Sequence, residues 1–308
     1  MAYPPPPHLL GRTFEVFAPA KANLALRIVG RRADGYHLLE MFNVLLGFGD
    51  TVRLTVCEAG VRRVGGRVEG EFELPGDFAD VGRNLAARAA DLFLSAYKYD
   101  LGFAIDITKR IPSGAGLGGG SSDAAAVLRI VREALDPDHT VSPEELAAIG
   151  LKLGADVPFF LGGQHALVRG IGEILEPVPV PRFGGIECLI IVPPVGVPTP
   201  VAYKRYRESR PIVPPRRPGE RSLPALVDSG AIEELIGNDL EEVVTTAYPE
   251  VGAALRLVRS SSGAVAGMTG SGSAIFCLPT LGRTFPQGFA GEMRSRLGCP
   301  VISTSIVG

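Results

Sequence analysis

Residues 111–127, IPSGAGLGGGSSDAAAV, join a glycine cluster to a helix start. Five glycines lie between positions 114 and 120, and Ser-Ser-Asp-Ala-Ala-Ala follows at once. Glycine loses more backbone entropy on folding than any other residue, so such a cluster indicates either a flexible loop or a backbone that must approach something closely. Because a flexible linker is not followed directly by a capped helix, the pattern favours an anion bound by backbone N–H groups at a helix N-terminus.

The loop differs from three well-known site motifs. Gly114, Gly116 and Gly119 satisfy GxGxxG, but the acidic residue that a dinucleotide fold places about 20 positions later is absent. Gly120 stands where a P-loop requires lysine, and Ser121 does not lie in the GxSxG of a hydrolase. Two interpretations remain: a phosphate loop that also presents the hydroxyls of Ser121 and Ser122, or a glycine loop that only packs tightly.

Three further segments carry polar residues suited to phosphate chemistry. Lys21, in APAKANLALRIVGRRADGYH, is expected between two apolar strands, where it is either functional or a lysine that extends to the surface. Asp156, in LGADVPFFLGG, either acts on a substrate or caps a turn. Residues 268–278, MTGSGSAIFCL, form a second glycine–serine turn, which by itself would indicate a tight hairpin.

The elements that position these segments are predicted from periodicity and capping signals. The first half is expected to contain strands at 14–18, 24–29 and 103–108, and helices at 84–96, from Ser122 or Asp123 to 135, and from the Ser142 cap to Gly154. Residues 162–185 are expected to cross between domains, and 205–221 to form an exposed loop. The second half is expected to contain strands at 186–192, 274–278 and 300–305, and helices at 231–235 and 251–259.

Composition limits the class of protein. With 308 residues, 46% of them apolar and a net charge of −2, the chain is expected to form two domains, 1–162 and 163–308, and to bind neither nucleic acid nor an anionic membrane. No stretch approaches the roughly 18 apolar residues of a membrane span, and the four cysteines have neither zinc-site nor disulfide-framework spacing. A cytoplasmic location is expected.

Together, the four segments resemble the GHMP kinases, which phosphorylate small molecules, in motif order across almost the whole chain. The resemblance implies an α/β (α+β) fold of two domains: an N-terminal domain like ribosomal protein S5 domain 2 and a C-terminal ferredoxin-like domain, with the active site in the cleft between them. DGYH at 34–37 is the most specific motif, supported by GVPTPVAYK at 196–204 and GNDLE at 237–241. In these motifs the chain is similar to the members of the family that use ATP and Mg²⁺ to phosphorylate the 2-hydroxyl of 4-diphosphocytidyl-2-C-methyl-D-erythritol, in the non-mevalonate pathway to isoprenoids.

The resemblance also implies roles for individual residues. Asp156 would act as the general base, or only position the alcohol, and Lys21 would orient Asp156 and screen phosphate charge. The implied ATP-binding residues are Pro112, Gly114, Ala115, Gly116, Leu117, Gly118, Gly119, Gly120, Ser121 and Ser122, with Ser121 or Ser122 near Mg²⁺. The implied substrate-binding residues are Asn23, Tyr36, His37, Asp156, Thr199 and Tyr203.

In this set the aromatic rings would stack on the cytosine and His37 would supply specificity by hydrogen bonds. Tyr203 replaces the phenylalanine of some relatives, and Ala115 replaces a glycine, which is tolerated if its φ is negative. Three rival interpretations remain: a GHMP kinase for homoserine or mevalonate, a non-catalytic binding protein of this fold, and a Rossmann oxidoreductase. The protein is expected to be a monomer or a weak homodimer.

Overall fold

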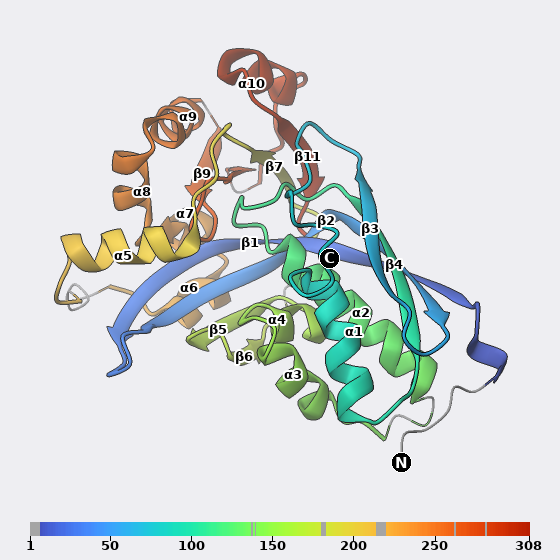
Figure 1. Cartoon of the computed structure of the whole chain (residues 1–308). Coiled ribbons are helices and arrows are strands. Elements are labelled where there is room, and N and C mark those ends of the chain that lie inside the picture. The colour runs from blue at the N-terminus through green and yellow to red at the C-terminus, as the bar shows by residue number, and fades with distance from the viewer. Residues whose placement is uncertain are drawn as a thin grey trace. The chain divides into compact units, whose positions relative to one another are not determined.

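The computed structural model describes residues 7–136, 138, 140–179, 183–213, 220–261, 263–280 and 282–308 (Figure 1). The chain divides into two compact units. The first consists of Met1–Ala20, Phe48–Ser113 and Gly118–Gly163, and the second of Lys21–Gly47, Gly114–Leu117 and Gln164–Gly308. Because two long strands and the glycine loop each contribute residues to both units, the units are not contiguous in sequence, and the boundary at 162/163 stays a prediction.

The first unit combines strands with a helical layer. Its elements are the ends of β1 (Thr13–Arg31) and β2 (His37–Cys57), with η1 (Pro7–Leu9), β3 (Arg62–Val68), β4 (Gly102–Lys109), α1 (Leu85–Ala96), α2 (Gly119–Leu135), α3 (Pro143–Leu151) and α4 (Val157–Gly162). β4 pairs antiparallel with β2 and parallel with β3. Helix α1 packs on β3, β4 and α2, and α2 also packs on α3 and α4 (Figure 1).

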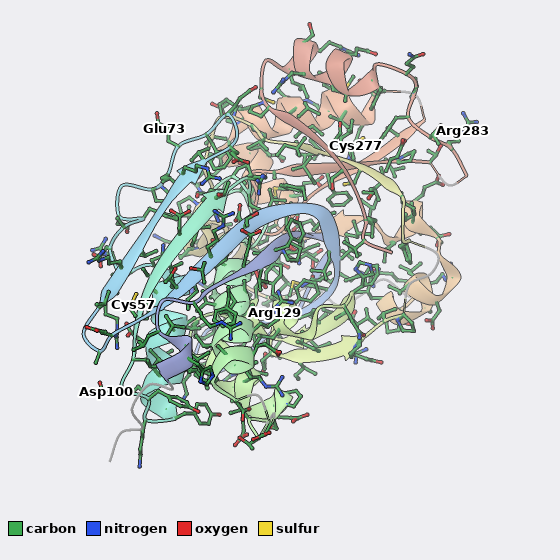
Figure 2. All side chains as sticks on the ribbon, turned by 90° about the vertical axis from the view of Figure 1, so that its right-hand side faces the viewer. Cys57, Glu73, Asp100, Arg129, Cys277 and Arg283 are labelled. Carbon is green, nitrogen blue, oxygen red and sulfur yellow. The ribbon has the colours of Figure 1, made fainter. Side chains whose placement is uncertain are left out.

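Helices α1 and α3 begin close to the positions expected from the sequence. Asn84 caps α1 by accepting a hydrogen bond from the Ala86 N–H, and Ser142 with Glu145 forms a complete capping box at α3. Ala124, Ala125 and Ala126 of α2 are buried, and the helix packs on α1 and α4. Arg129 lies on the same helix (Figure 2). The helix predicted for 84–96 and the strand predicted for 103–108 are therefore confirmed.

The second unit contains a four-stranded antiparallel sheet in the order β11-β7-β10-β9. Its strands are β7 (Glu187–Ile191), β9 (Ala264–Met268), β10 (Ile275–Pro279) and β11 (Val301–Ser305). Its helices are α5 (Thr199–Ser209), α6 (Leu223–Ser229), α7 (Ile232–Leu235), α8 (Glu241–Ala247), α9 (Pro249–Arg259) and α10 (Phe289–Leu297). Helices follow β7 and β10 but not β9, so the sheet has the βαββαβ connectivity of the ferredoxin-like fold that was expected.

The second unit also holds the other halves of the long strands. There β2 pairs with β5 (Ala166–Gly170), β5 pairs with β6 (Ile174–Pro177), and β1 pairs in parallel with β8 (Gly237–Asn238). Residues 162–185, which were expected to cross between domains, contain a hairpin of β5 and β6, and their role as a crossing stays a prediction. Residues 205–209 belong to α5 rather than to a loop, and 214–219 lie outside the described residues.

The cysteines and the helices relate to two expectations from the sequence, on disulfide or zinc sites and on membrane spans. All four cysteines are free; Cys57 ends β2 and Cys277 lies in β10 (Figure 2). Within the described ranges, no helix has both the length and the apolar character needed to cross a bilayer.

Candidate active site

The glycine loop ends at a helix that has no side-chain cap. Gly118 adopts a left-handed conformation with φ of 76° at the N-cap of α2, and it makes no side-chain capping hydrogen bond. The prediction that the helix begins at Ser122 or Asp123 is therefore wrong by about one turn, since α2 begins at Gly119. The N–H groups of the first turn are left without a side-chain partner, which is the state in which a helix N-terminus binds an anion.

Two serine hydroxyls lie in this first turn of α2. Ser122 Oγ is buried and has no hydrogen-bond partner among the described residues. Ser121 is half-buried, and a Cβ built on Gly154 would lie 3.6 Å from its Oγ. The start of α2 is thus adjacent, within the first unit, to the segment that carries Asp156.

Asp156 occupies the N-cap position of α4, where a turn-capping role was the alternative to a functional one. Its side chain makes no capping hydrogen bond, and the residue is half-buried. The helix instead begins through backbone contacts, with the Val157 N–H donating to the Gly154 carbonyl at 3.1 Å. Capping therefore does not explain the presence of an aspartate at this position.

The middle of the glycine loop belongs to the second unit and packs against the second glycine–serine turn. A Cβ on Gly116, whose φ is +81°, would lie 2.5 Å from the Thr269 carbonyl oxygen. The Ala274 N–H donates to the Ala115 carbonyl at 3.1 Å. Ala115 is not among the described residues with positive φ, as its replacement of a glycine requires. The two glycine-rich motifs are therefore parts of one packed structure.

Lys21 lies beside the same loop. It is 4% exposed and sits within the continuous strand β1, so the expectation of two separate strands around it is wrong. Its backbone N–H donates to the Leu117 carbonyl at 3.0 Å, and its Nζ donates to Asn23 Oδ1. The Asn23 Nδ2 donates to Asn43 Oδ1 at 2.5 Å and to Met41 Sδ at 3.6 Å, so Asn23 is itself fixed and holds the ammonium group in place.

A chain of polar contacts continues from Lys21 towards α5. The Asn23 N–H donates to Thr269 Oγ1 at 2.9 Å, and the Thr199 and Ser271 hydroxyls are 2.9 Å apart. Asn238 holds the same turn, because its Nδ2 donates to two turn carbonyls, those of Met268 and Gly270. Thr199 begins α5, so this network connects the turn to the helix that carries Tyr203.

The aromatic residues of DGYH and α5 meet in the second unit. The rings of His37 and Tyr203 stack with centroids 5.3 Å apart and an interplanar angle of 25°, and Tyr206 meets His37 edge-on. Burial, followed by the charges of Arg31 and Arg207, lowers the pKa of His37, so the imidazole is neutral near pH 7. Tyr36 is 63% exposed and available for a planar ligand.

Each unit thus assembles part of the predicted residue set. The first brings Ser121 and Ser122 next to the segment of Asp156, and the second brings Lys21 and Asn23 together with the loop, the glycine–serine turn and the His37–Tyr203 stack. That Asp156 and Lys21 serve one substrate stays a prediction.

Sequence reasoning missed a buried charged cluster at the loop. Lys109 is 4% exposed and its Nζ donates to both Asp50 and Asp123. A signal was available: Lys109 is one of only five lysines and ends the strand that leads into the glycine loop. The motif comparison selected Lys21 and left Lys109 without a role.

Family models match both halves of the chain. The GHMP kinases N terminal domain matches residues 84–164, and the GHMP kinases C terminal model matches 222–283. Among solved structures, the chain resembles a 4-(cytidine 5'-diphospho)-2C-methyl-D-erythritol kinase with a TM-score of 0.69 and 34% identity, covering 96% of this chain and 100% of the other. A homoserine kinase from Cytophaga hutchinsonii has a TM-score of 0.66 at 20% identity, covering 96% and 95%, and so shares the fold.

Curated relatives extend over most of the chain. A 4-diphosphocytidyl-2-C-methyl-D-erythritol kinase from Methylacidiphilum infernorum is 42% identical over 85% of this chain and 85% of its own. A protein of the same name from a Chelativorans species is 37% identical over 92% of each chain. The family models, the curated relatives and the fold agree, and the chain belongs to the GHMP kinases.

Proposed function

We propose that this protein transfers the γ-phosphoryl group of ATP to the 2-hydroxyl of 4-diphosphocytidyl-2-C-methyl-D-erythritol. The observation that carries the proposal is the assembly in one unit of the DGYH histidine, the α5 tyrosine, the lysine of β1 and the middle of the glycine loop. The curated relatives that carry this activity in their names support it over most of the chain.

The glycine loop is proposed to bind the ATP phosphates. Gly114, Gly116 and Gly118 have positive φ, which turns successive peptide units so that N–H groups can converge on an anion. The uncapped first turn of α2 adds its own N–H groups and its positive dipole end. Phosphoryl transfer needs mainly positioning and neutralisation of charge on the transferring oxygens, and this loop supplies both.

The residues at the start of α2 fit a magnesium ion bound with ATP. Mg²⁺ prefers oxygen ligands and keeps several waters, so one protein hydroxyl together with phosphate oxygens is sufficient. Ser122 Oγ is a buried oxygen that lacks a partner in the described structure, and Ser121 Oγ is accessible beside it. When bound, the ion would neutralise part of the phosphate charge.

Asp156 is proposed to accept the proton of the substrate hydroxyl as that oxygen bonds to the γ-phosphorus and the bond to ADP breaks. Lys21, fixed by Asn23, is proposed to screen the charge of the carboxylate and of the phosphate. His37 and Tyr203 are proposed to hold the cytosine ring, Thr199 to line the same pocket, and Tyr36 to cover the ring from its exposed position. A neutral imidazole offers one donor and one acceptor, which suits a neutral base.

Two conservative variants test the catalytic assignment. We expect Asp156→Asn and Lys21→Ala each to lower kcat by about 10²–10⁴-fold, the range for loss of acid–base or electrostatic groups. If the two residues serve one transition state, the double variant should be little slower than the worse single variant. Near-wild-type turnover in either single variant would refute its role, and melting temperatures provide the control for folding.

A further inference from the structure

Three charged side chains are buried together in the first unit, outside the residues assigned above. Asp50 is 0% exposed, Asp123 3% and Lys109 4%. They come from β2, α2 and β4 respectively. We call these three residues the loop clasp.

Asp50 holds the residues that lead into the glycine loop. Its Oδ1 accepts hydrogen bonds from the backbone N–H groups of Arg110, at 2.5 Å, and Ile111, at 2.8 Å. Its Oδ2 accepts from Lys109 Nζ. One carboxylate therefore fixes the backbone of residues 109–111, where β4 ends.

Lys109 connects this point to the far end of the loop. Its Nζ donates to Asp123 Oδ2 at 2.7 Å, in the first two turns of α2. A Cβ built on Gly119 would lie 3.3 Å from Lys109 Nζ and 3.0 Å from Ile111 Cγ2. The clasp therefore brings together the residues immediately before and after the loop segment 112–118.

The cluster is not arranged for stability alone. Asp123 Oδ1 has no partner among the described residues. A buried ion cluster is rarely more stabilising than apolar residues of the same volume, so its position at the loop requires another explanation.

We propose that Lys109, Asp50 and Asp123 are positioning residues, which hold both ends of the glycine loop in the geometry that binds the phosphates of ATP. The inference rests on the proposed function and adds residues to its nucleotide site. A loop whose ends are fixed has already lost the closure entropy that a free loop would lose on binding. Breaking the clasp should therefore weaken ATP binding and leave the binding of the cytidyl substrate unchanged.

Two substitutions of Asp123 that change the charge equally distinguish a positioning role from a purely electrostatic one. Asp123→Asn and Asp123→Ala both remove the negative charge and leave the balanced Lys109–Asp50 pair, but only asparagine retains an acceptor for Lys109 Nζ. Asp136→Ala is the matched control, because Asp136 lies at the other end of α2 and holds the N–H groups of Thr140 and Val141. ATP affinity in the presence of Mg²⁺ is measured by calorimetry on the full chain, with KM for both substrates and the melting temperature.

We expect Asp123→Ala to raise the Kd for ATP about tenfold, as for the loss of one charge-assisted hydrogen bond, and to leave KM for the alcohol unchanged. Asp123→Asn should stay within about threefold of wild type, by the smaller net worth of a retained hydrogen bond. Asp136→Ala should lower the melting temperature without affecting ATP affinity.

Several results would overturn the inference. They are wild-type affinity in Asp123→Ala, an equal loss in Asp123→Asn, or the same loss in Asp136→Ala. If wild type itself fails to bind ATP, the proposed function fails first, which is a distinguishable result. Should Asp123→Ala not fold, hydrogen exchange of the Arg110 and Ile111 N–H groups in nucleotide-free wild type decides: the clasp requires both to exchange slowly because Asp50 holds them, and exchange as fast as that of exposed loop amides would overturn it.

Discussion

Gly116→Ala is expected to damage the fold of the glycine loop itself, before any ligand binds. The new methyl group would lie 2.5 Å from the Thr269 carbonyl oxygen, and the residue would keep a φ of +81°. The left-handed backbone costs about 1–2 kcal/mol for an alanine, and forcing a carbon into a filled site typically costs about 1–3 kcal/mol more.

Gly114→Ala is the matched control, because Gly114 also has a positive φ, +69°, but nothing lies within 4 Å of its Cβ position. It should show the backbone cost alone. The two variants should therefore differ by about 1–3 kcal/mol in unfolding free energy, or about 2–4 °C in melting temperature for each kcal/mol.

The assay is thermal or urea unfolding without nucleotide, so that lost ATP contacts do not contribute. Equal melting temperatures for Gly116→Ala and Gly114→Ala would refute the packing of the loop against the 268–278 turn. A lower melting temperature in Gly114→Ala than in Gly116→Ala would refute it as well.

Three further predictions concern the second unit. His37→Ala should raise KM for the cytidyl substrate far more than KM for ATP, and an equal effect would place His37 outside the substrate pocket. Because the pKa of His37 is lowered, KM for the cytidyl substrate should stay constant from pH 8 down to about 6.5 and rise only below the lowered pKa. A rise in this KM centred above pH 6.5 would contradict a neutral, buried His37. Burial lowers the pKa of His165, whose Nδ1 accepts from the Leu45 N–H at 3.0 Å. The contribution of neutral His165 to stability is therefore present above about pH 6.5 and is lost as the pH falls through the lowered pKa of the folded state. Denaturant unfolding at several pH values should show this loss in wild type and not in His165→Leu.

The sequence was sufficient to predict the elements whose signals are local. The Ser142–Glu145 capping box marked a helix start that the structure confirms, and the alanine- and leucine-rich segment 84–96 forms α1. The glycine loop was recognised because no ordinary connection needs that many glycines before a helix, and the family resemblance that followed from it is confirmed.

The errors came from features that local patterns do not encode. Residues 19–23 were left between two predicted strands, and alanine and proline are poor strand formers, yet β1 is continuous and pairs with β8 far along the chain. The start of α2 was placed a turn too late, since a serine or aspartate is the usual cap and the left-handed Gly118 takes that role here.

The side-chain contacts of the site could not be predicted from the sequence, because local patterns do not encode them either. Asn23 was predicted to line the substrate pocket, and the structure shows its amide bonded to Lys21 and to Asn43, which comes near only on folding. The clasp required three elements to converge, and a lone Lys109 gave no indication of which carboxylates would meet it.

The most direct test of the proposed function is phosphate transfer by the purified full-length protein, followed by mass spectrometry. The protein is incubated with Mg²⁺ and ATP in three parallel reactions, each with one alcohol: 4-diphosphocytidyl-2-C-methyl-D-erythritol, mevalonate or homoserine. We predict that phosphate is added to the cytidyl compound alone, and that Asp156→Asn abolishes most of this product. Phosphate on mevalonate or homoserine instead would contradict the substrate assignment, and transfer to none of the three would contradict the kinase activity itself.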